Sequence, residues 1–333
     1  MATASPKSNT VSTKIIGQGV GAGPVFRLCV GAVVIAALVF MAASASAADM
    51  NVRDVRSATI KTPAPPSPWQ FQFTPYVWMP FVTGETQIGS TTSGVNTNFV
   101  DIFRRADRIY PWMSYQELRN GPFSIYANVI WSRMRFSDTR SGIFPIGPLN
   151  RSSLGIVADS KIWLDMAIIE SGFTYQFAQW RSGGAGNGSV QSTAVDVVAG
   201  GRYWFLRPDI DLNVTATVNI PALGLTRTGA GNVSATTTID WLDPFVGLRL
   251  RHAFAAGNEL VLQGDVGGFG IGSQFAWQAL ATYNIATRFL GLDLAGYVGY
   301  RALSIDYTEG SENNTLALDL ILHGPVVGLT FTW

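Results

Sequence analysis

The chain has 333 residues, of which 47% are hydrophobic and 14% are charged, and its formal net charge at pH 7 is +1. This balance excludes a nucleic-acid-binding protein, because such proteins carry clustered Lys and Arg on one face. The only cysteine, Cys29, lies in an apolar segment near the N-terminus, so the rest of the chain can form no disulfide and no thiolate.

The first 47 residues have the pattern of a secretory signal peptide. Three basic residues precede the apolar run 28–43, no acidic residue occurs before Asp49, and the small residues at 45–47 fit a cleavage site. The run is shorter than the roughly 18–20 residues that a membrane-spanning helix needs. We therefore expect residues 1–47 to be removed after export, with an uncleaved anchor helix as the alternative.

Residues 48–68 are expected to form a linker on the periplasmic side. Pro63, Pro65, Pro66 and Pro68 lie in this segment. Proline has no backbone N–H to donate to a β-ladder, and it favours extended geometry.

From Trp69 onward, apolar and polar residues alternate in segments that are separated by Gly, Asn, Asp and Pro. The pattern is clearest in 275–285 and 290–302, and a period of two over this length indicates strands rather than amphipathic helices. About ten strands are expected, near 69–83, 110–119, 122–137, 158–179, 190–205, 236–254, 259–269, 275–285, 290–302 and 315–333. Eight or twelve strands remain compatible with the pattern, because 209–220 is either a strand of its own or a continuation of the preceding one.

The connections between these strands alternate in length. Short turns are expected at 120–121, 255–258 and 287–289, and long loops at 84–109, 138–157 and 206–235, the first with a short helix near 102–109. Short turns on one side and long loops on the other are typical of outer-membrane barrels, with the long loops outside the cell. In lipid, only helices and closed barrels satisfy every backbone polar group. The sequence therefore predicts a transmembrane antiparallel β-barrel over residues 69–333, and a secreted soluble β-protein is the competing interpretation.

The chain ends on an aromatic residue of an alternating strand. Val327, Leu329, Phe331 and Trp333 share one face. Tryptophan is favoured at the membrane interface because its ring is amphipathic. An ending of this kind resembles the C-terminal signal that the barrel-assembly machinery recognises, so this machinery is an expected partner during biogenesis.

Five stretches resemble a group of Gram-negative outer-membrane barrel proteins, most of which have no assigned function. The stretches are FTPYVW (73–78), DWLDPFVGLRLRH (240–252), GDVGGFGIGSQFAWQ (264–278), GYRALSIDY (299–307) and GPVVGLTFTW (324–333). The resemblance implies a barrel in the outer membrane. It implies no activity and no catalytic residues.

Charged residues recur on the face of the strands that is opposite to the apolar one. A narrow barrel interior is filled by side chains, whereas an Arg facing lipid at the midplane would cost about 2–4 kcal/mol. We therefore expect an ion-paired lumen, to which Glu117 is a weaker addition because its strand alternates poorly. The residues of this expected lumen charge network are Asp196, Arg202, Asp243, Arg249, Arg251, Asp265, Asp293 and Arg301.

Enzymatic and ligand-binding patterns are weak. The glycine-rich segment 265–272 is followed by another strand and not by a helix, which argues against a phosphate-binding loop. His252 and His323 share the parity of lipid-facing residues, so we expect no catalytic site, no metal site and no cofactor.

The function hypothesis is a non-enzymatic outer-membrane protein with a structural or surface role, in contact with lipid and lipopolysaccharide. A narrow porin-like channel for small solutes is the alternative. A membrane-embedded hydrolase is a second alternative, although the carboxylate–histidine arrangement of omptin-like rim proteases is not found in the sequence.

Overall fold

A computed structural model describes residues 69–146, 152–182, 191–254, 257–289, 292–311 and 315–333. The expected signal peptide and linker fall on residues 1–68 and lie outside the described residues. No helix in the described part of the chain is long and apolar enough to cross a membrane.

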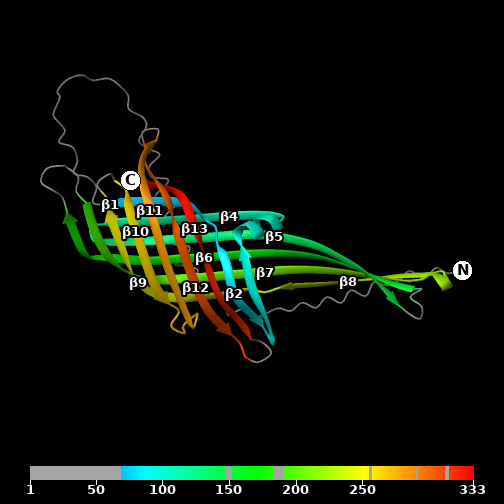
Figure 1. Ribbon diagram of the computed structural model, residues 1–333. Helices are drawn as coiled ribbons and strands as arrows, with labels where there is room; N and C mark the ends of the chain where they lie inside the picture. Colours follow the sequence, from blue (N-terminus) through cyan, green and yellow to red (C-terminus); the bar gives the residue numbers. More distant parts are fainter. Residues whose placement is uncertain (1–68, 147–151, 183–190, 255–256, 290–291, 312–314) are drawn as a thin grey trace, which may run out of the picture. The chain divides into compact units, whose positions relative to one another are not determined.

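Ten antiparallel strands form a closed ring (Figure 1). Each strand of the ring pairs with the next, and the last pairs back with the first, from Gln72↔Thr332 to Trp78↔Val326. The fold is therefore the predicted all-β transmembrane barrel with ten ring strands. They are β1 (Trp69–Trp78), β4 (Arg108–Asn120), β5 (Phe123–Ile146), β6 (Ser152–Ser182), β7 (Gln191–Ile220), β9 (Ile239–Ala253), β10 (Glu259–Gly267), β11 (Phe275–Phe289), β12 (Leu292–Glu309) and β13 (Leu316–Thr332).

Alternation along the strands separates an outer face from an interior. On β9, Leu242, Val246 and Leu248 are exposed, whereas Asp243 and Arg249 are buried. A large exposed apolar surface is unfavourable in water, so this outer belt suits contact with lipid. Other exposed apolar residues on the outside of the ring are Trp112, Phe123, Ile125, Phe173, Leu262, Val266, Val298, Val327 and Leu329.

Short turns lie at one end of the ring. Gly121 adopts a φ of 56° in the turn between β4 and β5, and the N–H of Phe254 donates to the carbonyl of Asn258 between β9 and β10. The third turn was expected at 287–289, but these residues belong to β11, and Phe289 pairs with Leu292 of β12.

The three segments expected as long loops consist mainly of strands, and this part of the prediction was wrong. The first contains the hairpin β2 (Phe81–Ile88) and β3 (Thr91–Asn98), followed by helix α2 (Phe99–Arg105), which Asn98 caps. The second and third continue β5, β6 and β7 beyond the ring, and β8 (Leu225–Thr236) pairs with the end of β7 after the short helix η2 (Pro221–Leu223). The sequence pattern failed here because these segments carry apolar residues too sparsely on the outer face.

These continuations form a four-stranded sheet that we call the extension. It contains residues 137–146 of β5, 152–162 of β6, 208–220 of β7, and β8 (Figure 1). On β5 the extension begins after Arg135, which forms the last pair with β4, at Arg108. On β7 it begins after Leu206, which forms the last pair with β9, at Ile239; beyond this point β7 pairs with β8. Residues 209–220 are thus the end of β7 and not a separate strand.

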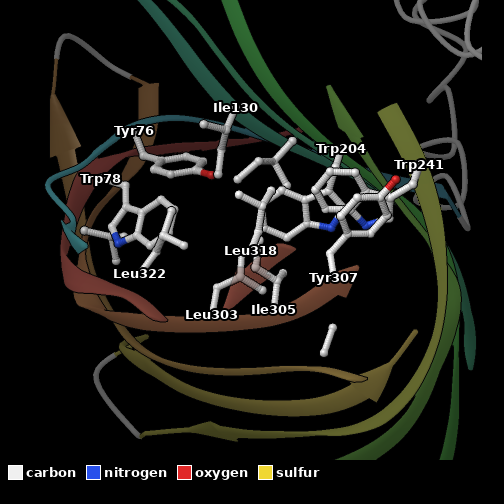
Figure 2. Close-up of a cluster of buried hydrophobic side chains, with 13 residues drawn as sticks. Tyr76, Trp78, Ile130, Trp204, Trp241, Leu303, Ile305, Tyr307, Leu318 and Leu322 are labelled. Atoms are coloured by element: carbon white, nitrogen blue, oxygen red, sulfur yellow. The ribbon is translucent and has the colours of Figure 1, made fainter. Parts of the chain in front are cut away.

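A hydrophobic cluster fills the end of the ring from which the extension continues. Figure 2 shows Tyr76 and Trp78 on one side and Trp204, Trp241 and Tyr307 on the other, with leucine and isoleucine side chains between them. The Trp241 and Tyr307 rings stack with centroids 3.9 Å apart. The other members of the cluster are Ile130, Ile168, Ala276, Leu303, Ile305, Leu318, Leu322 and Val326.

The C-terminal residue takes part in closing the ring. The backbones of Trp333 and Phe71 exchange two hydrogen bonds of 2.9 and 3.0 Å, and their rings stack with centroids 5.5 Å apart. Phe331 lies next to Phe73 on the neighbouring strand, with their rings tilted and the ring centroids 6.5 Å apart. The assembly role of Trp333 remains a prediction.

Candidate functional site: the barrel interior

Arg202 is the centre of a first group of buried charges inside the ring. Its Nη2 atom lies 2.6 Å from Oε1 of Glu170 on β6 and 2.8 Å from Oδ1 of Asp265 on β10. The second oxygen of Glu170 accepts a hydrogen bond of 3.0 Å from Arg301 on β12. Charge-assisted hydrogen bonds of this kind are stronger than neutral ones. The group therefore joins strands that are not neighbours in the ring.

A second group of charges lies nearer the short turns. Arg249 on β9 donates to Glu117 on β4 at 2.8 Å, and Arg119 donates to the same carboxylate at 2.6 Å. Arg251 donates to Asp196 on β7 at 2.8 Å, and Arg119 lies 3.5 Å from Asp196. Because Glu117 and Asp196 both face Arg119, the five charges form one connected group.

Asp243 has a different environment from the other buried carboxylates. In the described part of the chain its partners are neutral donors: Nε1 of Trp204 and of Trp241 at 3.1 Å, and the backbone N–H and Oγ of Ser273 at 2.6 and 2.7 Å. Asp243 thereby holds the segment between β10 and β11 at the end of the ring that contains the hydrophobic cluster. A Cβ on Gly272 would lie 2.5 Å from Oδ1 of Asp243, so the segment can dock only with glycine at this position.

The residues expected to form one lumen charge network belong to two charge groups and one separate site. The first group contains Arg202, Asp265 and Arg301, and the second contains Asp196, Arg249 and Arg251. Asp243 lies apart from both groups, and the side chain of Asp293 lies outside the described residues.

Two charged residues of these groups were missed by the sequence reasoning. Glu170 has the parity of the buried Ile168 and Thr174, which is a signal that could have identified it. Arg119 precedes the turn at Asn120 and gave no such signal, because the strand that carries it alternates poorly.

The interior contains little free volume between these groups. At the level of Tyr76, Tyr126, Glu170 and Arg301, the cavity has a volume of about 30 Å³, roughly that of one water molecule. A polar cavity of about 260 Å³ lies beside the second charge group and is bordered by Glu259 and Asn284 as well. The hydrophobic cluster fills the opposite end. At the level of Tyr76 and Arg301, the side chains of the described interior therefore leave little free space.

Aromatic rings contact the guanidinium groups of both charge groups. The guanidinium carbon of Arg301 lies 5.1 Å from the ring centre of Trp78, and that of Arg249 lies 5.2 Å from Tyr126. Cation–π contacts of this kind are favourable, most of all where water is excluded. The contact with Trp78 joins the first charge group to the hydrophobic cluster.

Both histidines occupy the outer face of the ring, as expected from their parity. His252 Nδ1 lies 2.8 Å from Oγ1 of Thr193, and His323 Nδ1 lies 2.6 Å from the hydroxyl of Tyr300. These partners do not include the nucleophile and carboxylate of a hydrolytic triad. Among the residues that the structure describes, no group of three or more His, Cys, Asp or Glu side chains could hold a metal ion.

Comparisons with known proteins find solved structures of low similarity to this chain. No family model and no curated protein matches the chain. Two similar solved structures are a Pseudomonas aeruginosa FadL homologue, with a TM-score of 0.27 and 8% identity over 80% of this chain and 90% of the other, and the TodX deltaS2S3 mutant monoaromatic hydrocarbon channel, with a TM-score of 0.17 and 10% identity over 79% and 90%. Similarities this low identify no solute, so the function has to be argued from the residues of this chain.

Proposed function

We propose that the protein is a non-enzymatic outer-membrane barrel with a surface role, whose interior is closed by ion pairs and aromatic packing. The observation that carries this proposal is the small cavity volume, about 30 Å³, that remains between Tyr76 and Arg301 in the described interior. Tyr76 also belongs to the hydrophobic cluster, so this level of the ring adjoins the apolar packing.

The connections inside the ring also support a rigid interior. Arg202 and Arg301 both bind Glu170, so three strands of the ring are held through one carboxylate. Opening a pore at this level would leave buried charges without partners, which costs several kcal/mol. A closed barrel keeps these ion pairs intact without any moving part.

Conductance in planar lipid bilayers tests the proposal. The purified full chain should show no steady ion conductance. The matched variant Tyr76→Gly/Trp78→Gly/Trp241→Gly removes three rings of the hydrophobic cluster, of which Tyr76 also borders the 30 Å³ cavity, and it should conduct. A wild-type conductance equal to that of the variant would overturn the closed-barrel proposal.

A small-solute channel is the second candidate. The polar cavity of about 260 Å³ near the short turns favours it, because the cavity is large enough for a small polar molecule. Transport by this route requires the hydrophobic cluster to open. Spontaneous openings of the wild-type chain in the same recordings would support the channel.

A further inference from the structure

We infer that one face of the extension is the docking surface for a second copy of this chain. The inference deepens the proposed surface role and rests on it, since the extension has to lie outside the membrane. It is carried by a reversal of polarity between the ring and the extension.

In the ring, the interior is polar at the charge groups and the outside is apolar. In the extension, the face that continues the interior is apolar instead. The register between β6 and β7 has no shift from Glu170↔Arg202 to Ser153↔Asn219, so residues of equal parity lie on one face throughout. On this face, which we call the apolar face, Ser160 is the one polar residue within 154–162 of β6 and 210–218 of β7. The other central residues are Leu154, Ile156, Ala158 and Ile162 of β6 and Ile210, Leu212, Val214, Ala216 and Val218 of β7.

The opposite face of the extension is polar. Asp159 pairs in register with Asn213, and Lys161 pairs with Asp211. Thr215 and Thr217 continue this face, and the hydroxyl of Thr217 hydrogen-bonds to Thr228 on β8. Because a polar sheet face of this kind is stable in water and not in hydrocarbon, the extension does not lie in the bilayer.

Within the described part of the chain, no second layer covers the apolar face. All of its central residues are partly or fully exposed, and Ile210 retains 40% of its exposure. On β8, a Cβ added to Gly229 or Gly231 would meet nothing within 4 Å. A single sheet with one apolar face needs a second layer to be stable in water.

The dimensions of this face fit another sheet better than a small ligand. From Leu154 to Ile162 the apolar face is about 26 Å long, and four strands make it roughly 19 Å wide. Two such faces together would bury on the order of 1,000 Å², which is what a specific interface needs. Small apolar ligands are held in concave pockets, whereas this face is open above Gly229 and Gly231.

Charged residues border the apolar face on the two outer strands. Asp138 and Arg140 of β5 form an exposed ion pair of 2.9 Å, and Arg227 of β8 lies on the same face opposite Val218. An apolar centre with a polar rim is the usual anatomy of a protein interface. Two sheets that pack face to face stand about 10 Å apart, a spacing that residues the size of Leu212 and Val214 can fill.

Cross-linking on intact cells tests the inference with the full chain. Cysteine is introduced on the apolar face as Val214→Cys or Ala216→Cys, and on the polar face as the matched neighbours Thr215→Cys or Thr217→Cys. A short bis-maleimide should give a dimer band with at least one variant of the apolar face, at least tenfold stronger than with either control. The unsubstituted chain shows any contribution from Cys29.

Mass measurement in detergent provides the second readout. The wild-type chain should have twice the mass of the Ala216→Asp variant, whose folding is checked by its resistance to SDS without heating. A monomeric wild type, or equal cross-linking from both faces, would overturn the inference. A monomer that retains an apolar molecule on this face would overturn it as well and would identify a ligand instead. None of these outcomes affects the conductance test, so the two proposals can fail separately.

Discussion

Arg202 on β7 and Asp265 on β10 form an ion pair of 2.8 Å across the intervening strand β9, with both side chains fully buried. Arg202 also binds Glu170 on the other side, so its single guanidinium group compensates two carboxylates. Buried ion pairs contribute little net stability compared with apolar residues, but the loss of one partner leaves an uncompensated charge.

The first prediction follows from this relationship. The substitution Arg202→Leu should destabilise the barrel by about 3–5 kcal/mol, because Asp265 loses its only ion-pair partner in the described part of the chain and Glu170 loses one of two. Urea unfolding of the protein in lipid vesicles measures the effect. The matched control is Arg140→Leu, which breaks the exposed pair with Asp138 and should change stability by less than about 1 kcal/mol. Equal losses in the two variants would contradict the prediction.

The ring could be predicted from the sequence because alternation is a local signal. The ring strands carry it, β4 more weakly than the others, and the two most regular segments, 275–285 and 290–302, correspond to β11 and β12. The extension could not be predicted in this way. Its apolar residues lie on the face that continues the interior, so they conflict with the outward-apolar pattern that identifies a membrane strand.

The ion-pair and hydrogen-bond partners of the interior side chains could not be predicted from the sequence either. Parity places Asp243 and Arg249 on the same side of β9, but it does not say which groups they reach across the ring. Arg249 reaches Glu117 on the far strand β4, and Asp243 binds two tryptophans and Ser273. These contacts depend on the diameter of the ring and on side-chain length, which no local pattern contains.

The second prediction concerns the docked segment between β10 and β11. The substitution Gly272→Ala should displace this segment, since the added Cβ would lie 2.5 Å from Oδ1 of Asp243 and 2.6 Å from the carbonyl oxygen of Leu242. Limited proteolysis should then cut faster near Phe269 and Ile271, which are exposed already. The control Gly94→Ala has open space around its Cβ and should leave the cleavage rate unchanged. Unchanged cleavage in Gly272→Ala would show that Asp243 does not hold the segment.

The third prediction concerns processing of the precursor. The basic residues before the apolar run 28–43 and the small residues at 45–47 indicate cleavage by a signal peptidase. Mass spectrometry of the protein from outer membranes should place the mature N-terminus at or near Ala48. Recovery of peptides from residues 1–40 in the membrane-inserted protein would show that this segment is retained.

The last prediction concerns the C-terminal residue. Trp333 stacks on Phe71 and on Phe331, and it exchanges two backbone hydrogen bonds with Phe71 at the junction of β13 and β1. The ring closes at this junction, so a chain without the aromatic residue should form its last strand pair more slowly and remain exposed to periplasmic proteases. Trp333→Asp, and deletion of Trp333, should therefore reduce the amount of inserted protein by about tenfold or more, measured as the heat-modifiable form in outer-membrane fractions. Trp333→Phe keeps an aromatic ring at the interface and should insert nearly as well as the wild type. Normal insertion of Trp333→Asp would show that closure and recognition of the barrel depend on other residues of β13, of which Phe331, packed against Phe73, is the next to substitute.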